Sequence, residues 1–132
     1  MSKSPESADS SADMVMKVES GDDLLIATVF GPVSVRRILE LLKDICDTAL
    51  ARGYPKILID CLGVTGELSI RERHAVGKDV SEYVRTNQMS LKIALLGEQP
   101  VMNGVGVAIA QNRGLNVELF YDRQRALAWL QT

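Results

Sequence analysis

Residues 24–30 read Leu-Leu-Ile-Ala-Thr-Val-Phe, and Gly31-Pro32 ends this run. Branched and aromatic side chains favour β-strands, and a strand that is apolar at every position is typical of a sheet covered on both faces. Just before it, residues 14–18 show the alternation of a strand, and residues 20–23 (Ser-Gly-Asp-Asp) have the composition of a hairpin turn. The sequence therefore predicts a β-hairpin whose second strand lies inside a sheet.

The rest of the chain alternates short apolar runs with segments of helical periodicity. Ser34 can cap a first helix that Gly53 ends, and residues 69–72 (Ser-Ile-Arg-Glu) have the spacing of a capping box that opens a second helix. Pro100 suits the first turn of a third helix, in which residues 101–112 have almost no polar face and should be mostly buried. Further strands are expected at residues 57–60, 91–96 and 115–121, and Asp122 is expected to cap a final helix.

The resulting order of elements, ββαβαβαβα, indicates an α/β fold. Alternating strands and helices join parallel strands by right-handed crossovers, which place helices on both faces of a sheet. We therefore expect a mostly parallel sheet of four to five strands with an antiparallel first strand. That first strand, at residues 14–18, leaves an edge to which a second copy could add, so a homodimer is a further prediction.

Composition divides the chain into a short tail and one domain. Residues 1–13 are Ser-rich and have no large apolar side chain after the initiator Met1, so we expect them to be disordered. Residues 14–132 should form a single domain with 14 basic and 14 acidic groups, because the tail carries one Lys and three acidic residues. The net charge of the whole chain, −2, offers no basic field to attract nucleic acid.

Other sequence features bear on the compartment in which the protein works. The longest stretch without a charge, residues 99–112, is shorter than the roughly 20 residues that a membrane-spanning helix needs. The N-terminus lacks the apolar centre of a secretory signal, and two cysteines make no disulfide framework. These features predict a cytoplasmic protein in a reducing compartment.

Few residues could carry chemistry. His74, the one histidine, could be a general base or a metal ligand, but on the apolar side of a helix we expect a half-buried packing residue instead. Cys61 follows a strand, where nucleophiles occur in open sheets, although a buried free cysteine usually acts as a small hydrophobe. The spacing supplies no zinc ligand set, and Gly104-Val105-Gly106 should lie inside a helix, where glycines allow close packing. We predict no enzyme, no metal and no cofactor.

The loops beyond the carboxyl ends of the strands are the remaining candidate site, because such loops line a crevice in an open parallel sheet. Ser69, at the expected start of a helix, is either a plain N-cap or a phosphorylation site, since free amides and the helix dipole stabilise a phosphate there. The expected rim of the crevice consists of Asp60, Thr65, Glu67, Gly97 and Glu98.

Three stretches resemble STAS-like domains, in particular the SpoIIAA-like subgroup that is grouped with SEC14-like lipid-binding folds. They are the helix from Arg71-Glu72-Arg73 to Gly77, the strand Lys92-Ile93-Ala94 with the later Asn112-Arg113-Gly114, and the C-terminal Phe120-Tyr121-Asp122 with Ala126-Leu127-Ala128-Trp129-Leu130. The resemblance covers nearly all of residues 14–131. In bacterial anti-sigma-factor antagonists of this fold, a kinase phosphorylates a serine in an Asp-Ser-Ser-Gly motif, which falls at Glu67-Leu68-Ser69-Ile70 here. The serine matches, the acid is conservatively changed, and the second serine and the glycine are absent.

This resemblance implies a non-enzymatic, regulatory, bacterial module that acts by contact with a protein partner. The alternative it implies is SEC14-like binding of a lipid-like apolar ligand, with transient association with a membrane surface. In that case a helix over the sheet would open, and the segment 100–109 is the candidate lid. The candidate lid residues are Val101, Met102, Val105 and Ile109.

Overall fold

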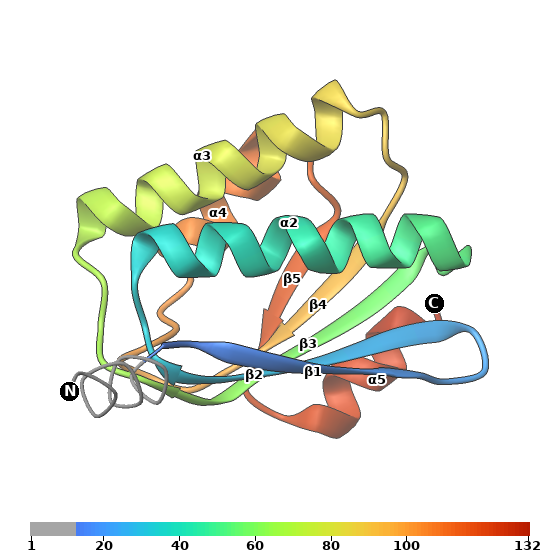
Figure 1. The fold of residues 1–132 in the computed structure, drawn as a ribbon, viewed down its shortest axis with the longest axis horizontal. Coiled ribbons are helices and arrows are strands. Elements are labelled where there is room, and N and C mark those ends of the chain that lie inside the picture. Colours follow the sequence, from blue (N-terminus) through green and yellow to red (C-terminus); the bar gives the residue numbers. More distant parts are fainter. Residues whose placement is uncertain (1–12) are drawn as a thin grey trace, which may run out of the picture.

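The computed structural model describes residues 13–132, so the predicted tail, apart from Asp13, lies outside the described residues. The order of elements is ββαβαβαβα, as the sequence predicted (Figure 1). The elements are β1 (Val15–Ser20), β2 (Leu24–Pro32), α2 (Val35–Arg52), β3 (Lys56–Thr65), α3 (Ile70–Thr86), β4 (Lys92–Leu96), α4 (Val105–Asn112), β5 (Val117–Phe120) and α5 (Arg123–Leu130).

The five strands form one sheet in the order β1-β2-β3-β4-β5. β1 pairs antiparallel with β2, and all other neighbours are parallel, which confirms the predicted mixed α/β sheet. Helices α2, α3 and α4 lie over one face of the sheet and α5 lies on the other (Figure 1). β1 is an outer strand, as predicted, and pairing of its free edge with a second copy stays a prediction.

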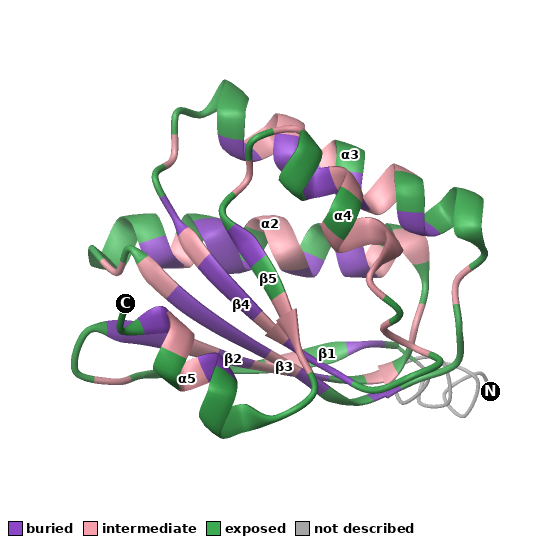
Figure 2. Cartoon of the chain, turned by 180° about the vertical axis from the view of Figure 1, so that it is seen from behind, coloured by how far each residue is buried: buried purple, intermediate pink, exposed green. Residues whose placement is uncertain are grey.

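Strand alternation divides the buried residues into two clusters, one on each face of the sheet. Ile57 and Ile59 of β3 point to the larger cluster under α2, α3 and α4, whereas Leu58 between them belongs to the smaller cluster under α5. Buried segments concentrate in the middle strands and on the inward faces of the helices (Figure 2). The strands that are apolar at every position are therefore explained by helices on both faces.

The predicted helix starts are confirmed for α2 and α3. Ser34 accepts a hydrogen bond from the Arg37 amide, and Gly53 ends α2 in the left-handed conformation, at φ 76°. Ser69 and Glu72 form the expected capping box of α3. No helix within residues 13–132 is long and apolar enough to cross a bilayer.

Two predicted boundaries are wrong. β3 does not stop at Asp60 but continues to Thr65, because its far end keeps pairing with β2 after a register shift. α4 begins at Val105 instead of in the turn at Pro100. Gly104, which was expected inside the helix, is its N-cap with a left-handed φ of 89°, and such a residue interrupts a right-handed helix.

α4 is also less buried than its apolar sequence suggested, since Ala110 is its one fully buried residue. The helix packs sideways against α3 and the edge strand β5, which leaves its outer side in contact with solvent (Figure 2). Close packing through its glycine is confirmed. A Cβ atom on Gly77 of α3 would lie 2.4 Å from the carbonyl oxygen of Gly106, so only glycine allows this approach of the two helices.

Candidate functional site

The start of α3 is a rigid and exposed corner of the molecule. The hydroxyl of Ser69 accepts a hydrogen bond from the Glu72 amide at 3.1 Å, and the Ser69 amide donates to the Glu72 carboxylate at 2.8 Å. Both bonds satisfy amides that a helix start otherwise leaves free. Ser69 is exposed, and the next residue, Ile70, is 72% exposed, the highest exposure of any large apolar side chain within residues 13–132.

The expected rim residues divide into two groups. Thr65, the last residue of β3, and Glu67, in the segment that leads to Ser69, are both exposed. Gly97 is buried and Glu98 is exposed directly after β4. These two segments approach each other at the start of α3, because Arg73 binds the carbonyl oxygens of both Leu68 and Pro100. Four of the five expected rim residues therefore belong to the two segments that Arg73 joins.

Asp60, the fifth expected rim residue, lies on the opposite face of the sheet. Its carboxylate accepts a hydrogen bond from the Leu62 amide at 2.9 Å and pairs with Arg123 of α5 at 3.0 Å. Side chains alternate along a strand, so Asp60 points with Leu58 toward α5 while Ile59 and Cys61 point toward the other helices. The structure gives Asp60 the role of an anchor for α5 rather than a place beside Ser69.

The candidate nucleophile and base do not come together. Cys61 is 5% exposed in the larger cluster, and burial, reinforced by the nearby Asp60 charge, raises the pKa of its thiol to about 12. Burial likewise raises the pKa of Cys46 to about 12. A thiol that stays protonated at neutral pH is a poor nucleophile. His74 is exposed, so the expectation of a half-buried packing histidine is wrong: its position on α3 faces solvent.

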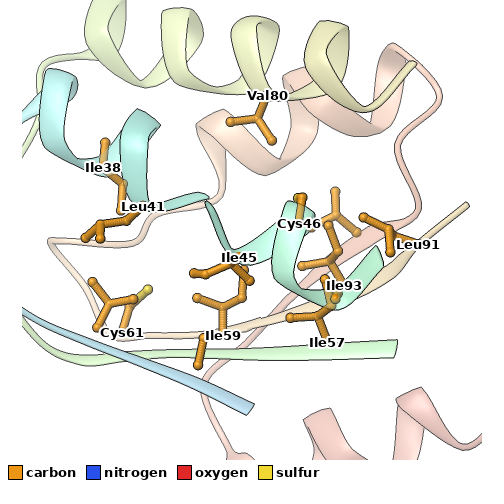
Figure 3. Packing of buried hydrophobic residues seen from close by; sticks show 14 of the residues in the cluster. Ile38, Leu41, Ile45, Cys46, Ile57, Ile59, Cys61, Val80, Leu91 and Ile93 are labelled. Carbon is orange, nitrogen blue, oxygen red and sulfur yellow. The ribbon is translucent and has the colours of Figure 1, made fainter. Parts of the chain in front are cut away.

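A cavity of about 130 Å³ lies between the sheet and the helices of the larger cluster. Residues from α2, α3, β3 and β4 face this region, as Figure 3 shows for Cys46, Val80, Ile59 and Ile93. Its walls are almost entirely apolar, and Arg73 is the one charged residue among them. Within residues 13–132, no group of His, Cys, Asp and Glu side chains could hold a metal ion.

Arg73 is the site residue that sequence reasoning missed. It is 6% exposed, and its guanidinium donates to the carbonyl oxygens of Leu68 (2.9 Å), Val101 (2.7 Å) and Pro100 (2.8 Å). A signal was present in the sequence, because positions 73, 77, 80 and 84 follow the helical spacing of the buried face of α3. An arginine among glycine and valine on that face indicates a charge held inside the protein.

The candidate lid residues have different roles. Val101 and Met102 line the cavity, in the segment that Arg73 holds, whereas the wall that α4 contributes includes Gly106, Val107 and Ala110 instead of Val105 and Ile109. Ile109 faces α3, because a Cβ atom added to Gly77 of α3 would lie 3.1 Å from the Cβ atom of Ile109. The cover over the cavity is therefore part loop and part helix, and not one helix from Pro100 onward.

Comparison with known proteins identifies the fold. No protein-family model matches the sequence, and no curated protein does. An anti-sigma factor antagonist from Mycobacterium paratuberculosis is 14% identical and superposes with a TM-score of 0.59, covering 92% of this chain and 97% of its own. A DUF3478 protein with a SpoIIAA-like fold from Shewanella loihica PV-4 is 19% identical, with a TM-score of 0.54 over 89% and 94% of the two chains.

The anti-sigma factor antagonist SpoIIAA in its unphosphorylated form is a third similar structure, 11% identical with a TM-score of 0.50, covering 89% of this chain and 98% of its own. The agreement extends over nearly the whole described domain in each case. At such low identities the likeness concerns the backbone and not the side chains of the site. The chain thus has the SpoIIAA-like fold of the STAS domains, as the resemblance in its sequence implied.

Proposed function

We propose that this chain is a non-enzymatic regulatory module that binds a protein partner through the start of α3. The observation that carries the proposal is the exposure of Ile70, 72%, directly beside the exposed Ser69 on a helix start fixed by a capping box. An apolar anchor on a rigid element loses little conformational entropy on binding, which favours recognition at that point. Similar folds in proteins named anti-sigma factor antagonists support a partner that is itself a protein.

Phosphorylation of Ser69 is the regulatory step that this geometry supports. The Ser69 hydroxyl oxygen already accepts the Glu72 amide, so phosphate oxygens could take over that bond and gain from the helix dipole. The Glu72 carboxylate, now bound to the Ser69 amide, would be repelled by the added charge. The capping box would open, and a strongly charged group would replace a neutral hydroxyl next to Ile70.

The absence of catalysis is supported by the state of the candidate groups. The Cys61 thiol is buried and protonated at neutral pH, and His74 is exposed on α3. Proton transfer needs a base within hydrogen-bond reach of the group that it activates. The burial of Cys61 and the exposure of His74 do not support a nucleophile–base pair between these two residues.

The experiment compares capture of one defined partner by four versions of the chain: wild type, Ser69→Glu, Ile70→Asp and Leu50→Asp. Leu50 is the matched control, since it is also a large exposed apolar residue (56%) but lies near the C-terminal end of a different helix, α2. A partner identified from the native host is purified and titrated against each version. We expect Ile70→Asp and Ser69→Glu to weaken binding at least tenfold and Leu50→Asp to leave it unchanged. Equal affinity of all four would contradict the proposed surface.

A second function, binding of an apolar ligand, is supported by the cavity under α4 and the segment before it. Its volume, about 130 Å³, resembles that of an engineered cavity of roughly 150 Å³ that binds benzene. A long acyl chain would fit only if the cover formed by Val101 and Met102 moved, which would also expose apolar surface to a membrane. Native mass spectrometry after mild purification tests this function, and a retained small apolar compound is the expected result.

A further inference from the structure

Arg73 places a positive charge at the wall of the cavity without a negative partner. Within residues 13–132 its hydrogen bonds go to backbone carbonyl oxygens, and none of the ion pairs there includes Arg73. A buried charge is costly unless an opposite charge or strong hydrogen bonds compensate it. Carbonyl dipoles offset part of that cost but leave the net charge of +1 in place.

The guanidinium also retains unused donors. It has five N–H groups, and three of them are used by the carbonyl oxygens of Leu68, Pro100 and Val101. One N–H group of each terminal nitrogen remains, so the guanidinium keeps two donors that could bind the oxygens of an anion. The three bonds already made hold the guanidinium in place, so little side-chain entropy is lost when an anion binds.

From this arrangement we propose that the cavity binds a small monocarboxylate with an apolar body, such as an aromatic or short branched carboxylic acid. The inference rests on the second function proposed above and names the chemical class of its ligand. The apolar body would occupy the space between Val80, Ile93 and Val107, and the carboxylate would face Arg73. The volume of about 130 Å³ limits the body to about the size of one benzene ring.

The probe for this proposal is benzoate, with benzyl alcohol as the uncharged molecule of nearly the same size. Binding is measured by calorimetry, and the Nε–H resonance of Arg73 is followed by NMR as a local signature. We expect benzoate to bind at least tenfold more tightly than benzyl alcohol, the difference that a charge-assisted pair supplies. Benzoate should shift the Arg73 resonance and benzyl alcohol should not.

Two variants on the same helix test the location without touching Arg73. Val107 lines the cavity, and Val105, also partly buried on α4, does not. Val107→Phe should fill the space and abolish binding of both probes, whereas Val105→Phe should leave both affinities within a factor of two. Arg73→Lys keeps the charge but has three donors in place of five, and it should reduce the preference for benzoate several-fold.

The outcomes separate the two levels of the proposal. Equal affinity for benzoate and benzyl alcohol, with loss of both in Val107→Phe, would overturn the carboxylate inference and leave apolar-ligand binding standing. Binding of neither probe would overturn both, and the cavity would be a packing space. If the Val107→Phe variant still bound benzoate, the benzoate site would lie elsewhere on the surface, and this result would also contradict the proposal.

Discussion

The Nη1 atom of Arg73 lies 2.7 Å from the carbonyl oxygen of Val101, a contact between residues 28 positions apart in the sequence. This bond and the bond from Arg73 to the Pro100 carbonyl oxygen hold the segment after β4 against the start of α3. The same guanidinium binds Leu68, one residue before the N-cap serine. One buried side chain thus holds together the exposed corner at Ser69 and the cover of the cavity.

Replacing Arg73 should therefore destabilise the domain. In Arg73→Met the aliphatic volume is kept, but the carbonyl oxygens of Leu68, Pro100 and Val101 lose their donors. Removing three part-buried hydrogen bonds leads us to expect a loss of about 2–4 kcal/mol in the free energy of unfolding, measured by urea denaturation. The control is Arg71→Met, an exposed arginine two residues away, which should change stability by less than about 0.5 kcal/mol. Equal effects of the two variants would show that the buried hydrogen bonds contribute little.

The contact between α3 and α4 depends on Gly77. A Cβ atom there would meet the Gly106 carbonyl oxygen at 2.4 Å, and because this atom belongs to the backbone, α4 itself must shift. We expect Gly77→Ala to cost about 1–3 kcal/mol in the free energy of unfolding. Gly21→Ala is the control, since its nearest neighbour, the Leu24 carbonyl oxygen at 3.4 Å, is at ordinary contact distance. Unchanged stability of Gly77→Ala would mean that the two helices separate at no cost.

The N-cap role of Ser69 is testable apart from any partner. Ser69→Ala removes the acceptor for the Glu72 amide, and loss of an N-cap typically costs about 1 kcal/mol. The melting temperature should therefore fall by about 4 °C for a domain of this size. Ser90→Ala is the matched control, since Ser90 is exposed and lies outside any helix, where it caps nothing. A melting temperature unchanged in Ser69→Ala would contradict the capping box.

The two cysteines should be inert in the folded protein. Burial raises the pKa of Cys46 and of Cys61 from 9.0 to about 12, so at pH 8 neither forms an appreciable fraction of thiolate. We expect labelling by a thiol reagent only after urea unfolds the chain, while the exposed site in Ser90→Cys reacts at once. Rapid labelling of both native cysteines in the folded state would show that the cluster around them opens readily.

The same shifts set a pH dependence of stability. A pKa that is higher in the folded than in the unfolded state means that folding favours the protonated thiol, so this contribution is complete below pH 9. It is lost as the pH rises from 9 toward 12, because the unfolded chain ionises first. The urea midpoint should fall over that range, and it should fall less steeply in Cys61→Ala. An equal slope in both proteins would contradict the assigned pKa of Cys61.

Local sequence patterns were enough to predict the elements and their order. The apolar run from Leu24 to Phe30, the Ser34 cap and the Ser69–Glu72 capping box each act over a few neighbouring residues, so their physical causes can be read along the chain. The mixed sheet with helices on both faces followed from the alternation of these elements. The fold was therefore determined largely by local propensity and periodicity.

Tertiary structure alone decided the site. The sequence predicts Asp60 on the same rim as Thr65 and Glu67, but the alternation of β3 within the sheet turns it to Arg123 on the other face. The start of α4 moved from Pro100 to Val105, and the segment before it is held by Arg73, which is distant in sequence. Contacts between residues far apart in the chain depend on how whole elements pack, and no local pattern contains that information.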